Sequence, residues 1–144
     1  LEHVIIFERN YEFNFDWQSF LELGKMYNKH DVSLKEDQIE FDHPCHIQYT
    51  SGTTGKPKGA LLTNHNLINN GFFVGKNQNF TENDVICLPV PLFHCFGSVL
   101  GAFAALFHES CIVLPSETFD AKICIQTIEN YKCTALYGIH MMFS

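Results

Sequence analysis

A segment of eleven residues, rich in glycine, hydroxyl and lysine side chains, is the part of the chain best equipped for chemistry. It reads Tyr49-Thr50-Ser51-Gly52-Thr53-Thr54-Gly55-Lys56-Pro57-Lys58-Gly59. Glycines let the backbone turn tightly and approach a ligand, and successive backbone N–H groups in such a turn bind anions. The two lysines add positive charge that suits phosphate. The segment therefore predicts a polyphosphate-binding loop, with a flexible surface loop as the alternative.

The spacing of this segment differs from that of the common NTPase phosphate loop. That loop has a glycine five residues before the glycine of its Gly-Lys pair, and a Ser or Thr directly after the lysine. Thr50 and Pro57 occupy those positions. Because proline lacks a backbone N–H and blocks the direct start of a helix, we expect the loop to continue into a strand.

The composition limits the class of protein and of partner. The chain has 144 residues, 46% of them apolar and 17% charged, which is typical of a folded domain. A net charge of -7, with no cluster of Lys or Arg in the sequence, gives a nucleic-acid partner no electrostatic basis. The longest nearly apolar run, 96–107, is shorter than the roughly 20 residues that span a bilayer, so we expect a buried helix there and no transmembrane segment.

The cysteines and the first residue bear on the context of the chain. There are six cysteines, some in apolar stretches such as those around Cys87 and Cys111, and none form a C-x-x-C pair. We therefore expect reduced, buried thiols in an intracellular protein rather than a disulfide framework. Because the chain begins with Leu1, we expect it to be part of a longer protein.

The order of the expected elements indicates the fold class. Apolar runs predict strands at 4–7, 46–50, 60–63, 85–88, 111–114 and 134–137. Helical spacing predicts helices after Asp16, after Thr63 or Asn64, at 98–107 and at 119–131. The polar segment 29–42 is expected to be a surface connection with one helical turn capped by Ser33. Alternating strands and helices predict an α/β fold of βαβ units with a mostly parallel sheet.

The loop and the segments that follow it resemble the adenylate-forming superfamily of acyl-CoA synthetases, firefly luciferase and peptide-synthetase adenylation domains. The resemblance covers 42–144 in one register, and its motifs are the loop, the junction 61–67, the segment Pro91-Leu92-Phe93-His94-Cys95-Phe96-Gly97 and the strand ending in Leu136-Tyr137-Gly138. Residues 1–41 match more weakly and would be an upstream part of the same large N-terminal domain. Within the superfamily, these motifs look most like the medium-chain acyl-CoA synthetases of mitochondria, which implies a mitochondrial location.

The resemblance implies a two-step reaction and the residues that carry it. Such enzymes use ATP and Mg²⁺ to join a carboxylic acid to AMP, release pyrophosphate, and pass the acyl group to coenzyme A. By position, the ATP phosphates would be held by Thr50, Ser51, Gly52, Thr53, Thr54, Gly55, Lys56, Pro57 and Lys58. Thr50 would also help to coordinate Mg²⁺. Lys58 and His94 would be the catalytic residues, whereas Lys56 stands where the family varies.

The acyl substrate would contact residues of the later motifs. These are Phe93, His94, Phe96, Gly97, Tyr137 and Gly138. From the residues alone, a merely exposed His94 and ordinary core packing of Phe96 stay open. His43, Cys45 and His46 lie close together in the sequence, but alternation along a strand puts neighbours on opposite faces, which disfavours a metal site there.

The sequence departs from the family pattern, and these departures bear on the function that we expect of this chain. Ile139 and His140 follow the Leu-Tyr-Gly strand where many relatives have proline. The family's adenine-stacking, ribose-binding and lid segments are not found in the sequence, so we expect an acyl-CoA ligase as the parent protein and no activity in this chain alone. A non-catalytic fragment or pseudo-enzyme with residual phosphate binding is the alternative. Pro57 disfavours a generic NTPase, and the His94 segment disfavours a peptide-synthetase unit.

Overall fold

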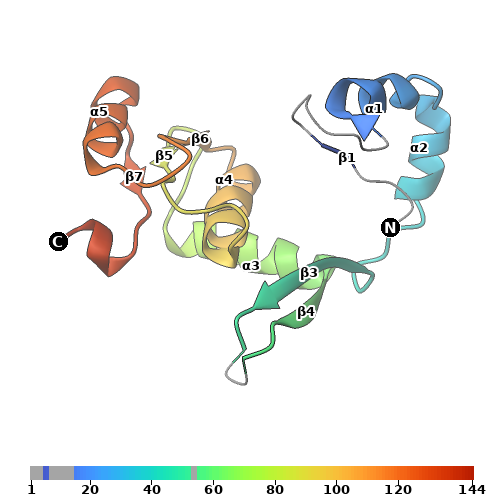
Figure 1. Ribbon diagram of the computed structural model, residues 1–144, viewed down its shortest axis with the longest axis horizontal. Coiled ribbons are helices and arrows are strands. Elements are labelled where there is room, and N and C mark those ends of the chain that lie inside the picture. The colour runs from blue at the N-terminus through green and yellow to red at the C-terminus, as the bar shows by residue number, and fades with distance from the viewer. Residues whose placement is uncertain (1–4, 7–14, 53–54) are drawn as a thin grey trace. The chain divides into compact units, whose positions relative to one another are not determined.

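A computed structural model of the chain describes residues 5–6, 15–52 and 55–144 (Figure 1). The chain divides into two compact units, Leu1–Glu40 and Phe41–Ser144. In the part of the chain that the structure describes, no helix is long and apolar enough to cross a membrane.

The described residues of the first unit, 5–6 and 15–40, form a pair of short strands and two helices. Strand β1 (Ile5–Ile6) pairs in parallel with β2 (Phe15–Asp16), and helix α1 (Trp17–Gly24) follows directly. As predicted, Asp16 caps α1, because its Oδ1 accepts a hydrogen bond from the Ser19 N–H at 2.7 Å. The strand predicted at 4–7 is present as β1, and Val4 and Phe7 lie outside the described residues.

The segment predicted as a surface connection is partly a helix. Helix α2 runs over Lys29–Glu36, and the predicted cap Ser33 lies inside it. The capping residue is Asn28, whose Oδ1 accepts a hydrogen bond from the Asp31 N–H at 2.9 Å. Asn28 has the extended backbone that a capping residue needs, so the helix begins one turn earlier than the Ser33 pattern suggested.

The second unit begins with a hairpin and a long helix. Strands β3 (Pro44–Thr50) and β4 (Lys58–Thr63) are antiparallel, and helix α3 (Asn64–Asn77) follows β4. Thr63 caps α3 in a capping box: its Oγ1 accepts from the Asn66 N–H at 3.3 Å, and Asn66 Oδ1 accepts from the Thr63 N–H at 3.0 Å. This junction was predicted correctly from the sequence.

A three-stranded parallel sheet forms the centre of the second unit. Strand β5 (Val85–Cys87) lies between β6 (Cys111–Val113) and β7 (Ala135–Leu136). The helices around it are η1, a π-helix (Phe96–Phe103), α4 (Ala104–Phe107) and α5 (Ala121–Tyr131), and a short turn of 3₁₀-helix, η2 (His140–Met142), follows β7. Figure 1 shows the sheet between α5 on one side and α4 on the other. The predicted α/β class is confirmed, and the hairpin is the antiparallel exception.

The core lies along the central strand. Ile86, Cys87 and Leu88 are its largest fully buried side chains. Helix α3 approaches η1 and α4 through two glycines, because a Cβ at Gly71 would lie 2.7 Å from the Cβ of Phe103, and one at Gly75 would lie 2.5 Å from Nδ1 of His108. These glycines let the helices pack at a distance that a larger residue would prevent.

Two predictions of burial are wrong in the second unit. Leu106 was expected to be buried, yet its side chain is 66% exposed. It lies on α4, directly after the π-helix η1, and the wider turn of a π-helix shifts which of the following positions face the core. Cys111 was expected to be a core thiol and is exposed, because it begins the edge strand β6. The six cysteines are free thiols: Cys87 and Cys124 are buried as expected, Cys133 is partly buried, and Cys45 and Cys95 are exposed like Cys111.

Candidate functional site

The predicted phosphate loop is the turn of the hairpin. Thr50 pairs with Lys58 at the base of the loop, so the loop runs from one strand directly into another. The position of Pro57 in the sequence predicted this. Gly52 and Gly55 have φ angles of +59° and +83°, in the region that favours glycine. A Cβ at Gly52 would collide with the backbone carbonyl of Lys56. Thr53 and Thr54 lie outside the described residues.

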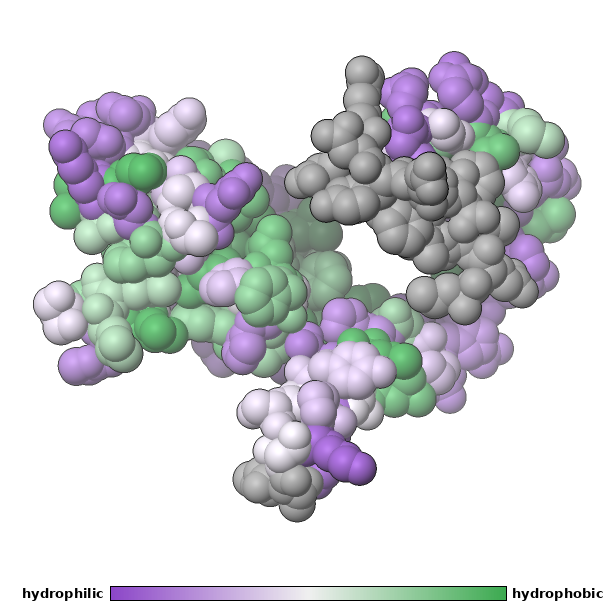
Figure 2. Space-filling model, in the orientation of Figure 1, coloured by the Kyte–Doolittle hydropathy of each residue, from purple (hydrophilic) through white to green (hydrophobic). Residues whose placement is uncertain are grey.

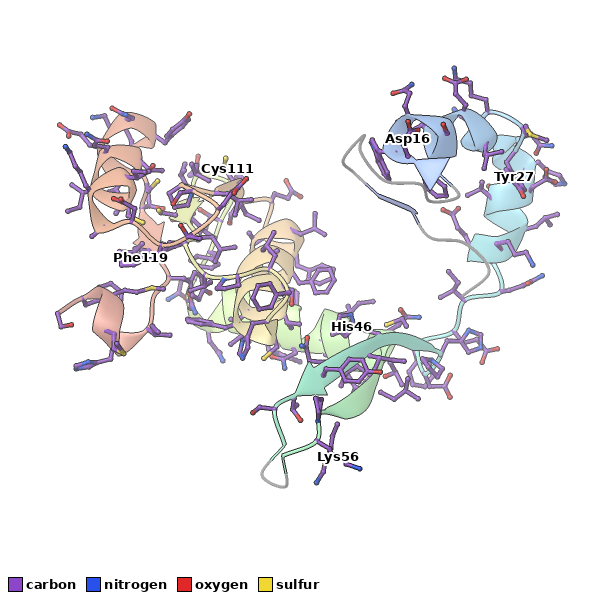
Figure 3. The ribbon with its side chains drawn as sticks, in the orientation of Figure 1. Asp16, Tyr27, His46, Lys56, Cys111 and Phe119 are labelled. Atoms are coloured by element: carbon purple, nitrogen blue, oxygen red, sulfur yellow. The ribbon has the colours of Figure 1, made fainter. Side chains whose placement is uncertain are left out.

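The charged and hydroxyl groups of the loop are available to a ligand. Ser51, Lys56 and Lys58 are exposed, and Figure 3 shows Lys56 projecting away from the far end of the hairpin. The hydroxyl of Thr50 donates a long hydrogen bond, 3.4 Å, to the Lys58 carbonyl and keeps its oxygen lone pairs for another partner. The backbone N–H groups of the tight turn, the hydroxyl groups and the two lysine ammonium groups together form a set of donors that fits phosphate.

His94 lies in a tight turn between β5 and η1. Its backbone N–H donates to the Pro91 carbonyl at 3.2 Å, and its own carbonyl accepts from Gly97 and Ser98 N–H groups, both at 3.0 Å. A Cβ at Gly97 would collide with the Pro91 carbonyl, so the turn closes only with glycine there. The sequence predicted that Gly97 shapes the acyl pocket. In the structure, Gly97 lies against the Pro91 carbonyl, where it lets the turn close.

The ring of His94 caps the start of η1. The Phe96 N–H donates to His94 Nδ1 at 3.1 Å. Because a backbone N–H can only donate, Nδ1 must accept and the ring proton of the neutral form must be on Nε2. His94 is exposed, so this Nε2–H is a hydrogen-bond donor that can reach a carboxylate or phosphate oxygen.

The loop hairpin is hydrogen-bonded to the turn that carries His94. The side-chain amide of Gln48, on β3, donates to the Phe93 carbonyl at 3.2 Å. Side chains two residues apart on a strand point to the same face. Thr50 therefore shares the face of Gln48, and the base of the loop and the His94 turn lie on one side of the hairpin. Sequence reasoning missed Gln48, and no signal could have found it, because its partner is a backbone atom 45 residues away.

An apolar cavity lies beside His94. Its volume is about 220 Å³, and it is lined by Val90, Pro91, Phe93, His94, Phe96, Ile139 and Met142. A larger cavity of about 530 Å³ shares Val90, Pro91, Phe93 and Met142 with it and extends to Glu117 and Phe119. Hydrophobic residues gather on the visible face of this C-terminal part of the chain, whereas the end of the hairpin is mainly hydrophilic (Figure 2). The two surfaces suit an apolar acyl chain and a charged nucleotide, respectively.

The predicted acyl-pocket residues divide into two groups. Phe93, which is 84% exposed, and Phe96 line the cavity beside His94. Phe96 also packs on Tyr137, with ring centroids 5.5 Å apart, so the core packing that the sequence left open occurs as well. Gly138 instead lies against Phe143, where a Cβ would be 2.7 Å from the ring.

Tyr137 is a buried structural residue rather than an open contact of that cavity. Its side chain is 8% exposed, and its hydroxyl lies 2.7 Å from the Leu100 carbonyl oxygen and 2.9 Å from Gln78 Oε1. Burial raises the pKa of this hydroxyl, while the Gln78 hydrogen bond lowers it in part. Its ring lines a separate apolar cavity of about 220 Å³ next to α5.

Metal ligands are sparse in the described residues. No group of three or more His, Cys, Asp or Glu side chains within 5–6, 15–52 and 55–144 could hold a metal ion. Thr50 supplies one hydroxyl oxygen at the base of the loop. That suits Mg²⁺, which keeps several waters and takes few protein ligands when it binds with a nucleotide.

Comparison with known proteins identifies the family. The family described as AMP-binding enzyme matches residues 7–144. The chain belongs to this family. The predicted resemblance to the adenylate-forming superfamily is thereby confirmed.

Relatives of this chain include acyl-CoA ligases. It is 43% identical over 143 residues to the acyl-CoA ligase sidI of Aspergillus fumigatus, covering 99% of this chain and 24% of that protein. It is 37% identical over 145 residues to the mitochondrial medium-chain acyl-CoA ligase ACSF2 of Danio rerio, again covering 99% and 24%. The chain thus spans about a quarter of the length of these relatives.

Solved structures agree with the fold of this chain. ATP-bound MatB from Rhodopseudomonas palustris superposes with a TM-score of 0.67 and 29% identity, over 72% of this chain and 20% of that one. A malonyl-CoA ligase complex with methylmalonyl-CoA and AMP gives a TM-score of 0.67 and 30% identity, over 74% and 23%. The likeness confirms the predicted fold.

Proposed function

We propose that the full-length gene product is an ATP-dependent acyl-CoA ligase, and that this chain supplies its phosphate loop and part of its acyl pocket. One observation carries the proposal: the Gln48–Phe93 hydrogen bond holds the loop hairpin beside the His94 turn, which borders an apolar cavity. A phosphate site, a donor for a carboxylate and a place for an acyl chain are thereby adjacent. The relatives named acyl-CoA ligase support the same reaction class.

The two reaction steps follow from the chemistry of the substrates. A carboxylate oxygen attacks the α-phosphorus of ATP, the bond to pyrophosphate breaks, and acyl-AMP forms; the thiol of coenzyme A then attacks the acyl carbon, losing its proton as AMP leaves. The carboxylate is already ionised, so the first step needs no general base. Catalysis there consists of positioning and charge stabilisation. Mg²⁺, when bound, would neutralise phosphate charge.

Individual residues of the chain would share this work. The loop 50–58 would hold the β- and γ-phosphates, with Lys58 as the principal cation, Lys56 as the lesser one and Thr50 as a ligand of Mg²⁺. The Nε2–H of His94 would donate to the carboxylate or α-phosphate oxygen as charge shifts between them. Phe93 and Phe96 would contact the acyl chain, which we propose to be a medium-chain fatty acid, in a mitochondrial enzyme, by analogy with relatives bearing those names.

Carboxylate-dependent exchange of pyrophosphate into ATP tests the proposal. We expect exchange by the full-length product with fatty acids of about medium length, and a loss of about 10-fold or more for Lys58→Ala but a smaller loss for Lys56→Ala. For the 144-residue polypeptide alone, which spans a quarter of its relatives, we expect weak phosphate binding and no exchange. A folded full-length product that exchanges with no acid would contradict the ligase and favour a pseudo-enzyme.

A further inference from the structure

The side chain of Gln48 makes hydrogen bonds at both of its ends. Its Nε2 lies 3.2 Å from the Phe93 carbonyl oxygen and 3.4 Å from the carbonyl oxygen of Tyr49. Its Oε1 lies 3.2 Å from Nε2 of His46, which stands two residues earlier on the same face of β3. Gln48 and His46 are both partly buried, whereas Ile47 and Tyr49 on the opposite face are exposed.

The partners fix which way the amide of Gln48 faces. The two carbonyl oxygens can only accept, so the NH₂ group must point toward Phe93 and Tyr49, and Oε1 toward His46. His46 then donates from Nε2, which it can do in its neutral and in its protonated form. The orientation of Gln48 is therefore set from two sides, whatever the charge of His46.

The bond to Phe93 restrains the peptide group that leads into His94. The carbonyl of Phe93 and the N–H of His94 belong to the same planar peptide unit. Gln48 holds the carbonyl, and the Pro91 carbonyl holds the N–H at 3.2 Å. The Phe93 side chain is mostly exposed and adds little packing, so these two hydrogen bonds set the plane from which His94 projects.

We propose that Gln48 is a positioning residue for the adenylation step: it aligns His94 with the phosphate loop. This inference rests on the proposed function. Gln48 is two residues from the start of the loop on the same strand and acts on a turn 45 residues away, so a shift of one segment displaces the other. In adenylation, the carboxylate held at His94 must come within bonding distance of the α-phosphorus of the ATP whose phosphates are held at the loop. A rigid connection between the two segments serves that geometry.

Kinetics of the full-length product test the proposal. Gln48→Met keeps a similar length but removes the amide; because a misplacement of about 1 Å can cost about 100-fold, we expect kcat for exchange to fall at least about 10-fold, with KM for ATP changed less than about threefold. Gln48→Glu keeps the acceptor for His46 but turns a carboxylate toward two carbonyls, and we expect a similar loss. Gln126→Met, at an exposed position of α5, is the matched control and should leave exchange unchanged.

A double-mutant cycle separates positioning from general support of the fold. In a His94→Asn background there is no Nε2–H to align, so we expect Gln48→Met to lower exchange by less than about twofold. A full 10-fold loss in that background, or a loss accompanied by weaker ATP binding and a lower Tm, would overturn the proposal. An unchanged kcat in Gln48→Met would overturn it too. If the wild-type product itself exchanges with no acid, the ligase proposal has failed, and this inference fails with it.

Discussion

The hydroxyl of Tyr137 lies 2.7 Å from the carbonyl oxygen of Leu100, so the chain leaving β7 is hydrogen-bonded to the middle of η1. In a π-helix the backbone bonds run from i to i+5, and such segments are rare and often stand at functional sites. Here the π-helix begins directly after the His94 turn. Tyr137 thereby connects the parallel sheet to the helix that His94 caps.

Tyr137→Phe should destabilise the protein through the loss of hydrogen bonding, because phenylalanine keeps the ring and leaves the packing of the core unchanged. The substitution leaves the Leu100 carbonyl and the Gln78 side chain without this partly buried hydroxyl, and such a loss costs about 1–3 kcal/mol of unfolding free energy. Urea unfolding of the full-length product measures it. A cost under about 0.5 kcal/mol would mean that water replaces the hydroxyl and that the bond contributes little.

His94→Asn and His94→Ala should separate the two functions of the ring. The side-chain oxygen of Asn can accept a hydrogen bond from a backbone N–H two residues on, as His94 Nδ1 does from Phe96, but it lacks the Nε2–H. We expect both variants to lose exchange about 10-fold or more, and only His94→Ala to lower Tm as well. Retained exchange in His94→Asn would show that Nε2 touches no reacting group.

Gly97→Ala should disrupt the turn that carries His94. A Cβ at this position would lie 2.7 Å from the Pro91 carbonyl carbon. The backbone at Gly97 and the backbone at Pro91 are both part of the turn, so neither can move without shifting it. We expect exchange to fall at least about 10-fold, because small displacements of positioning groups are costly. Gly24→Ala is the matched control, since a Cβ there meets nothing within 4 Å. Equal activity of the two variants would show that the turn tolerates a side chain at this position.

Stability should decline at alkaline pH because of buried thiols. Burial raises the pKa of the Cys87 thiol from an ordinary value of 9.0 to about 11, and the neighbouring Cys133 adds to the shift. Between these values the unfolded chain loses the proton and the folded chain keeps it, so the free energy of unfolding falls as pH rises from about 9 to 11. Urea midpoints between pH 7 and 11 measure this fall.

Cys87→Ala should flatten that decline. The variant loses some stability at neutral pH because it leaves a small cavity, but its unfolding free energy should depend less on pH above 9. Burial also raises the pKa values of the thiols of Cys124 and Cys133, so a weaker dependence should remain. Parallel pH curves for the wild type and the variant would contradict a buried, protonated Cys87.

The local chemistry of the sequence determined much of the fold and the site. Hydrogen bonds between neighbours in the chain are readable from residue types, so the cap Asp16 and the strand after Pro57 were predicted correctly, and Thr63 was one of the two predicted caps of α3. The local pattern around Ser33 was insufficient, because the cap of α2 is Asn28. The family motifs also predicted that His94 and the loop belong to one site.

Only the tertiary structure decided the relations that depend on distant partners. The amide of Gln48 and the hydroxyl of Tyr137 bind backbone oxygens 45 and 37 residues away, and every residue carries such an oxygen, so the sequence holds no mark of the partner. Cys111 is exposed because β6 is an edge strand, and Leu106 is exposed on α4, which follows the π-helix η1. Burial and long-range hydrogen bonds depend on which segments meet, and that is a property of the folded chain as a whole.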